Sequence, residues 1–175
     1  PQQCPYLTAP KERVDIWAQK LAGMDVKIGI CWQGEAGGVP LAEFAPLTAV
    51  RGVRLIALHT QGVLRGTAPV PFGGKIERPL VDASVSPETI LDIAAIIANL
   101  DMVIGIDALP IHMAGALGKP TWMATPLVPD WRWLLEREDS PWYPQMRLFR
   151  QDDPGQWAPV FAQITAALRE WLTAR

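Results

Sequence analysis

Strand-length apolar runs alternate with helix-length segments along almost the whole chain, and this alternation limits the folds available to it. Mostly apolar runs occupy Val26–Trp32, Val53–Leu58, Met102–Ile106 and Thr121–Thr125, and the first two are interrupted only at their second residue. Runs without polar alternation are typical of strands buried on both faces of a sheet. Because helical patterns separate these runs, we predict an α/β, Rossmann-like, three-layer domain with a mostly parallel sheet of about five or six strands.

Helix signals fall between the predicted strands. They combine spaced apolar side chains with an opening proline, a capping residue or a closing glycine. The predicted helices are Lys11–Leu21, Pro40–Val50, Pro87–Leu100, Pro110–Leu117 and Trp157–Trp171. Shorter apolar stretches at Ile76–Val81 and Met146–Phe149 complete the set of expected strands.

Composition excludes several classes of protein. The 175 residues carry a formal net charge of −2, with acids and bases interspersed, so we expect no nucleic-acid partner. No apolar run approaches the roughly 18 residues of a membrane span. Two cysteines, Cys4 and Cys31, fit free thiols in a reducing compartment, and we expect a cytoplasmic protein. The chain starts at Pro1 without a methionine, which suggests a piece of something longer.

The junction after Met102–Ile106 carries the strongest functional signal. The strand stops at Asp107, and a helix of small residues opens at Pro110 with His112 in its first turn. Helix-start amides at the carboxyl edge of a parallel sheet form an anion site. Such junctions and lone histidines are also routine in cores, but the pair favours function. We expect Asp107 and His112 to share one face and to border a solvent-reachable hollow.

Other motifs narrow the chemistry. The loop Gln33–Gly38 lacks the glycine spacing of dinucleotide sites and of P-loops. No histidine or cysteine pair has metal-ligand spacing, so we expect no metal, and we expect no cofactor either. No serine sits in a nucleophile elbow, so a hydrolase triad has no support. The aromatic segments Trp131–Trp133 and Trp142–Tyr143 either stack on a base or sugar or fasten a long crossover to the sheet, and the second interpretation is favoured.

Four segments together resemble a known family. They resemble the C-terminal half of bacterial glycosyltransferases often found behind tetratricopeptide repeats. Those proteins are similar to the lipopolysaccharide heptosyltransferases of glycosyltransferase family nine and share the GT-B architecture. The segments are Val26–Gly34, Ile96–Asp107, His112–Pro120 and Pro129–Pro144.

The resemblance implies a domain that binds a nucleotide-diphosphate sugar. It divides the chain into a lead-in segment and helix, residues 1–24, and a Rossmann-like nucleotide-sugar-binding domain, residues 25–175. The implied partner is an N-terminal GT-B half that holds the acceptor, or tetratricopeptide repeats. The acceptor-activating base would come from that other half, so we expect no catalysis from this domain alone. Hexosyl or heptosyl transfer is the implied activity of the joined halves.

Carried onto this sequence, the family pattern implies a set of donor-binding residues. The resemblance implies that Asp107 orients donor hydroxyls and that His112 with the helix amides stabilises the leaving diphosphate. Trp131 is expected to form one wall of the cleft. The full donor-binding set is Asp107, Ala108, Pro110, His112, Met113, Trp32, Gln33, Gly34, His59 and Gln61.

Two departures from the family pattern support an alternative. Ala108 stands where the family has a hydroxyl residue, and Glu35–Val39 lacks the basic residues usual in that loop. Losing a charged hydrogen bond weakens binding roughly 10- to 100-fold. The alternative is a degenerate, non-catalytic interaction module that retains the half-fold and contacts a partner through exposed apolar surface. A nucleotide-sugar epimerase is a more distant possibility, since no acid/base carboxylates are identifiable.

Overall fold

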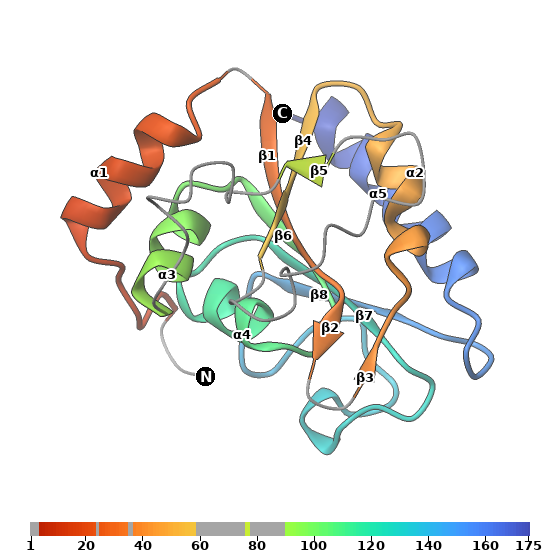
Figure 1. Cartoon of the computed structure of the whole chain (residues 1–175). Helices are drawn as coiled ribbons and strands as arrows, with labels where there is room; N and C mark the ends of the chain where they lie inside the picture. The colour runs from red at the N-terminus through yellow and green to blue at the C-terminus, as the bar shows by residue number, and fades with distance from the viewer. Residues whose placement is uncertain (1–3, 24, 35–36, 59–75, 78–89) are drawn as a thin grey trace.

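A parallel sheet organises the molecule. The computed structural model describes residues 4–23, 25–34, 37–58, 76–77 and 90–175. Within these residues, six parallel strands form one sheet in the order β5-β4-β1-β6-β7-β8 (Figure 1). The strands are β1 (Val26–Cys31), β4 (Val53–Ala57), β5 (Ile76–Glu77), β6 (Met102–Gly105), β7 (Thr121–Thr125) and β8 (Met146–Arg150).

The strand order determines where a ligand can bind. Counted along the chain, the sheet strands lie in the order 3-2-1-4-5-6, the doubly wound Rossmann arrangement. The chain reverses its direction of winding between β1 and β6, and the loops after these two strands therefore diverge. Ligands of open α/β sheets bind in the crevice that this divergence leaves at the carboxyl ends of the strands. The predicted Rossmann-like fold is confirmed.

Helices cover both faces of the sheet. Figure 1 shows α1, α3 and α4 on one side and α2 and α5 on the other. The described helices are α1 (Lys11–Lys20), α2 (Ala45–Thr48), α3 (Ile90–Ala98), α4 (Leu109–Ala116) and α5 (Ala158–Thr173), with 3₁₀ turns η1 (Leu41–Phe44) and η2 (Trp131–Trp133). No helix in these ranges is both long enough and apolar enough to cross a membrane.

Two apolar layers lie on opposite faces of the sheet. Ile28 and Ile30 of β1 belong to the layer on the side of α2 and α5. Phe44 and Phe161 complete that layer, with ring centroids 4.4 Å apart. Val103 of β6 belongs to the opposite layer, with side chains of α3 and α4. Strands β6 and β7 are buried along their whole length, which accounts for the lack of charged residues in their sequences.

Two local predictions differ from the structure. The helix predicted over Pro40–Val50 is divided into η1 and α2. Pro46 has no N–H to continue the hydrogen-bond ladder, which accounts for the break. The loop predicted over Gln33–Gly38 contains a two-residue antiparallel ladder between β2 (Gln33–Gly34) and β3 (Gly37–Gly38). Residues 78–81 and 87–89 of the predicted edge strand and third helix lie outside the described residues.

Helix α1 is anchored to α3. The buried Trp17 indole Nε1 donates to Asp92 Oδ1 at 3.3 Å. Asn99 Nδ2 donates to the Val14 carbonyl at 2.9 Å, just beyond the end of α3. The lead-in helix therefore contributes a large aromatic side chain to the core.

Replacing Trp17 should test this anchorage. Trp17→Ala removes a buried aromatic side chain, so we expect the free energy of unfolding to fall by about 3–5 kcal/mol. Ile16→Ala on the same helix is the matched control, because Ile16 is 49% exposed and should change stability by less than about 0.5 kcal/mol. Urea unfolding measures both. Similar small losses in the two variants would contradict the packing of α1 on the domain.

Candidate functional site

Before the chain continues to opposite faces of the sheet, the β2–β3 hairpin after β1 lies against the Asp107 junction after β6. A Cβ atom at Gly34 would overlap the main-chain carbonyl oxygen of Asp107, so the hairpin can lie against this junction only because position 34 is glycine. A Cβ at Gly105 would likewise overlap the Cys31 sulfur. Two close approaches thus bring the Gln33–Gly34 hairpin to the start of α4.

Asp107 and His112 contact each other as the sequence predicts. His112 Nε2 lies 2.9 Å from Asp107 Oδ1. Because a carboxylate only accepts hydrogen bonds, Nε2 carries the hydrogen in this contact. The Asp107 side chain is 24% exposed and the His112 side chain is 29% exposed, so the pair reaches solvent. The expectation that both groups share one face is confirmed.

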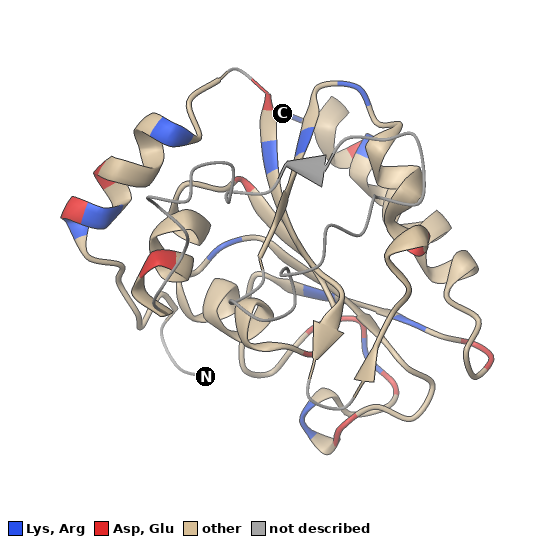
Figure 2. Cartoon of the chain, viewed as in Figure 1, with Lys and Arg blue, Asp and Glu red and all other residues tan. Residues whose placement is uncertain are grey.

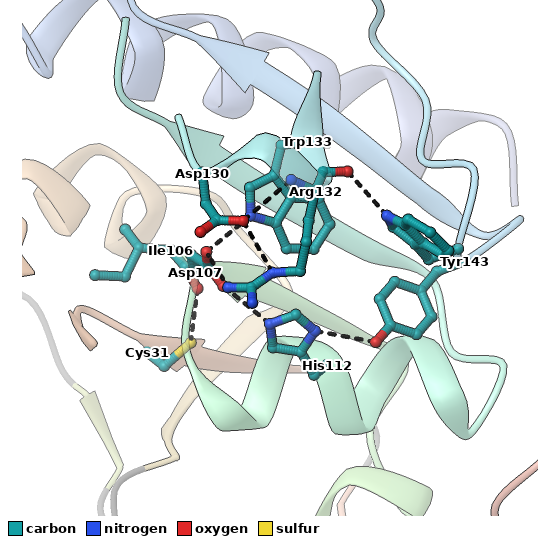
Figure 3. Close-up of polar contacts among 9 residues, drawn as sticks. Cys31, Ile106, Asp107, His112, Asp130, Arg132, Trp133 and Tyr143 are labelled. Carbon is teal, nitrogen blue, oxygen red and sulfur yellow. Dashed lines mark hydrogen bonds and ion pairs between the residues drawn. The ribbon is translucent and has the colours of Figure 1, made fainter. Parts of the chain in front are cut away.

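The Asp107 carboxylate also receives two side chains from the long crossover after β7. Trp133 Nε1 donates to Asp107 Oδ2 at 2.8 Å, and Arg132 Nη2 donates to the same oxygen at 3.4 Å (Figure 3). Burial acts to raise the pKa of Asp107, but the hydrogen bonds from His112 and Trp133 outweigh it, together with the charges of His112 and Arg132. The pKa falls to about 2.

The His112 ring is held at its second nitrogen as well. Nδ1 lies 3.0 Å from the Tyr143 hydroxyl, which donates to it when the imidazole is neutral (Figure 3). Burial, followed by the contact with Tyr6, raises the pKa of Tyr143. A Cβ at Gly115 would overlap the Tyr143 ring, so the ring can pack against α4 only because position 115 is glycine. Both ring nitrogens of His112 are therefore engaged.

Hydrogen bonds hold the aromatic residues of the crossover after β7 in place, both within the crossover and to the sheet. Asp130 caps η2 by accepting from the Arg132 N–H at 3.0 Å, and Trp142 Nε1 donates to the Arg132 carbonyl at 2.9 Å. Arg150 of β8 donates to the Trp133 carbonyl at 2.5 Å. The fastening interpretation thus describes Trp133, which is buried. Trp131 differs, because 71% of its surface is exposed.

The remaining predicted site residues have different surroundings. Ala108 caps α4 without a side-chain hydrogen bond, and both Pro110 and Met113 are buried in its first turns. Trp32 is buried in the layer beneath α2 and α5, whereas Gln33 of β2 is exposed. His59 and Gln61 lie outside the described residues.

Sequence reasoning missed three residues of this site: Arg132, Trp133 and Tyr143. It noted them as part of an aromatic crossover but did not connect them with Asp107, which lies 25 and 26 residues before the first two. The available signal was indirect. Gly115, a residue of α4 without a side chain, is buried against the Tyr143 ring, and a glycine inside a helix can mark such a close approach.

A shallow hollow lies beside this cluster. Its volume is about 680 Å³. Asp107 and His112 are not among its lining residues, so the expectation that this pair borders a hollow is not confirmed by it. It is lined by Pro129, Asp130, Trp131, Leu134, Leu135, Glu136 and Arg137. Among the described residues, no group of three or more His, Cys, Asp and Glu side chains could hold a metal ion.

Comparison with solved structures shows which fold this is. A glycosyl transferase family 9 structure from Veillonella parvula DSM 2008 matches with a TM-score of 0.69 at 14% identity, covering 97% of this chain and 54% of that one. The chain has the fold of a family 9 glycosyltransferase. The E. coli ADP-heptose LPS heptosyltransferase II matches with a TM-score of 0.57 at 16% identity, covering 97% of this chain and 56% of that one.

A curated relative extends the comparison. Protein FlbA of Caulobacter vibrioides (strain ATCC 19089 / CIP 103742 / CB 15) is 29% identical over 187 residues, which cover 98% of this chain and 30% of FlbA. The domain thus spans about a third of this relative and about half of each solved structure above. No protein-family description matches the chain.

Acid unfolding should reveal the lowered pKa of Asp107. A folded pKa of about 2, against an ordinary 3.8, stabilises the fold above pH 3.8, and this contribution disappears as the pH falls through about 2. We expect the difference in unfolding free energy between wild type and Asp107→Asn to shrink by about 2 kcal/mol over this window.

Denaturant unfolding of both proteins from about pH 6 to about pH 2 measures this difference. Asp101 and Asp139 also have lowered pKa values, but both proteins contain them, and their contributions cancel. A difference that stays constant across the whole pH range would contradict the assigned role of the Asp107 carboxylate.

Proposed function

We propose that this chain is the nucleotide-sugar donor-binding domain of a glycosyltransferase and is not catalytic alone. The Asp107–His112 pair carries the proposal, because it lies where a doubly wound sheet binds ligands. The fold of family 9 glycosyltransferases supports it. The base that activates the acceptor would come from a second GT-B half, as would the acceptor site itself.

The contacts in the structure refine the role of each group. Asp107 Oδ1 accepts from His112, and Oδ2 accepts from Trp133 and Arg132. A carboxylate offers about four acceptor positions, so one on Oδ1 is left for a sugar hydroxyl. Because both nitrogens of His112 are engaged, we assign His112 to positioning the start of α4. The N–H of Leu109, the first residue of that uncapped turn, would then donate to the diphosphate. Pro110 has no N–H, and the N–H groups of Ile111 and His112 already donate to the Ala108 carbonyl.

The context of the domain forms part of the same proposal. Because the chain spans about half of the solved glycosyltransferases, we propose an N-terminal GT-B half or tetratricopeptide repeats as its partners. Residues 1–24 would be the lead-in to a donor domain at 25–175. The free thiols of Cys4 and Cys31 fit a reducing compartment, so we propose that the protein acts in the cytoplasm.

Ligand-induced thermal stabilisation tests donor binding. The chain is titrated with ADP, GDP, UDP and CDP and with sugar derivatives of each, ADP-heptose among them. We expect the melting temperature to rise with at least one of them, since a ligand that binds only the folded state stabilises it. His112→Ala should weaken that binding about tenfold, because it releases the first turn of α4.

Lys11→Ala is the control, because Lys11 lies on the exposed face of α1 and pairs with Asp15 of the same helix. It should bind the same ligand as tightly as wild type. Absence of any shift at millimolar ligand would sink the donor-binding proposal. Equal binding by wild type and His112→Ala would remove His112 from the site.

One observation favours the second candidate function, an interaction module that binds no donor. Large apolar side chains are exposed around the hollow, notably Val128, Trp131 and Leu135. Contiguous apolar surface on a domain marks sites of protein contact. Such a module would use this surface and leave Asp107 without a ligand.

The interaction module predicts association that depends on this surface. Val128→Asp combined with Leu135→Asp should reduce self-association or partner binding, because both side chains are exposed and can accept a charge without unfolding the domain. Light scattering over a wide range of concentrations measures this. Unchanged association in the double variant, together with a donor-induced thermal shift in wild type, would exclude the module.

A further inference from the structure

The proposed donor site needs a positive charge that its own elements do not supply. A diphosphate is strongly anionic, and a helix start contributes only a partial charge. Helix α4 and the described residues of the β2–β3 hairpin contain no Lys or Arg, and Figure 2 shows both as uncharged segments. Asp107 and Asp130 add negative charge nearby. This inference rests on the proposed function.

Arg132 is the basic side chain that the structure places there. Of the described Lys and Arg residues, only Arg132 contacts Asp107. Its backbone is held on both sides, because Asp130 accepts from its N–H and Trp142 donates to its carbonyl. Figure 3 shows its guanidinium lying over Asp107 and beside His112. The Arg132 side chain is 41% exposed, so an anion in solvent can reach it.

The contacts that hold the guanidinium are long. Nη2 lies 3.4 Å from Asp107 Oδ2, and Nε lies 3.2 Å from Asp130 Oδ1. Charge-assisted hydrogen bonds are typically about 2.7–2.9 Å. Nη1 has no hydrogen-bond partner within the described ranges. A phosphate can therefore offer Arg132 shorter, paired contacts than its present partners do.

Moving Arg132 would leave no unpaired carboxylate behind. Asp107 keeps the donor from His112 at 2.9 Å and the donor from Trp133 at 2.8 Å. Stranding a buried charge is what makes most ion pairs costly to break, and here that penalty is small. The arginine is thus held close to the ligand site without being committed to its carboxylate.

We propose that Arg132 is the cation that binds the diphosphate of the nucleotide-sugar donor, exchanging its contact with Asp107 for the phosphate oxygens. No covalent step is involved. The proposal supplies the positive charge that the loop at Glu35–Val39 lacks in its sequence.

Binding measurements on Arg132 variants test the proposal. For the nucleoside diphosphate that wild type binds, Arg132→Ala should lower the affinity roughly 10- to 100-fold, and Arg132→Lys should recover part of it. The affinity for the matching nucleoside without phosphates should not change. Arg147→Ala is the matched control, because Arg147 has an equally long ion pair, 3.4 Å to Glu138, on the exposed surface of β8. It should bind as wild type does.

A second measurement does not depend on the folding of Arg132→Ala. The Nε–H signal of Arg132 in a nitrogen–proton NMR spectrum, identified by its loss in Arg132→Lys, should move when inorganic pyrophosphate is added to wild type. Equal diphosphate affinity in wild type and Arg132→Ala, or an unmoved signal at saturation, overturns the role of Arg132 and leaves the donor site standing. Failure of wild type to bind any nucleotide overturns both proposals.

Discussion

The Asp107 carboxylate is the interaction on which the site depends. It joins three donors from two separate parts of the chain: His112 in the first turn of α4, and Arg132 and Trp133 in the crossover after β7. Together with the Tyr143 hydroxyl, which lies 3.0 Å from His112 Nδ1, it attaches the crossover to the start of α4. Because the carboxylate is partly buried, its charge is stabilised by these donors more than by water, which accounts for the lowered pKa of Asp107.

Close backbone approaches make this arrangement possible. Gly34, Gly105 and Gly115 stand at three places where a Cβ atom would overlap a neighbouring group. The first two bring the loop after β1 to the end of β6, and the third admits the Tyr143 ring beside His112. The strand order places these junctions together at the point where the winding of the sheet reverses. Small residues and topology thus act together to form one site from three loops.

The fold and half of the site could be predicted from the sequence because their signals are local. Mostly apolar runs predict buried parallel strands. Asp107 and His112 are close in the sequence, because the first lies just before α4 and the second in its first turn. Contacts of Arg132, Trp133 and Tyr143 could not be predicted, because a crossover can fold back on the sheet in many ways and no periodic pattern selects one. Pro46 was visible in the sequence, but the apolar spacing around it favoured a continuous helix.

The backbone at Leu134 has φ of 52° and ψ of −171°, a conformation that side-chain-bearing residues rarely adopt. It directly follows Trp133, whose carbonyl is held by Arg150, a residue of the outermost strand β8. The chain therefore turns sharply between a buried indole and an apolar, solvent-facing rim. Since that turn is tethered to the sheet's margin, the geometry around the Asp107 carboxylate is controlled in part from β8, two strands away from β6, the strand that Asp107 follows.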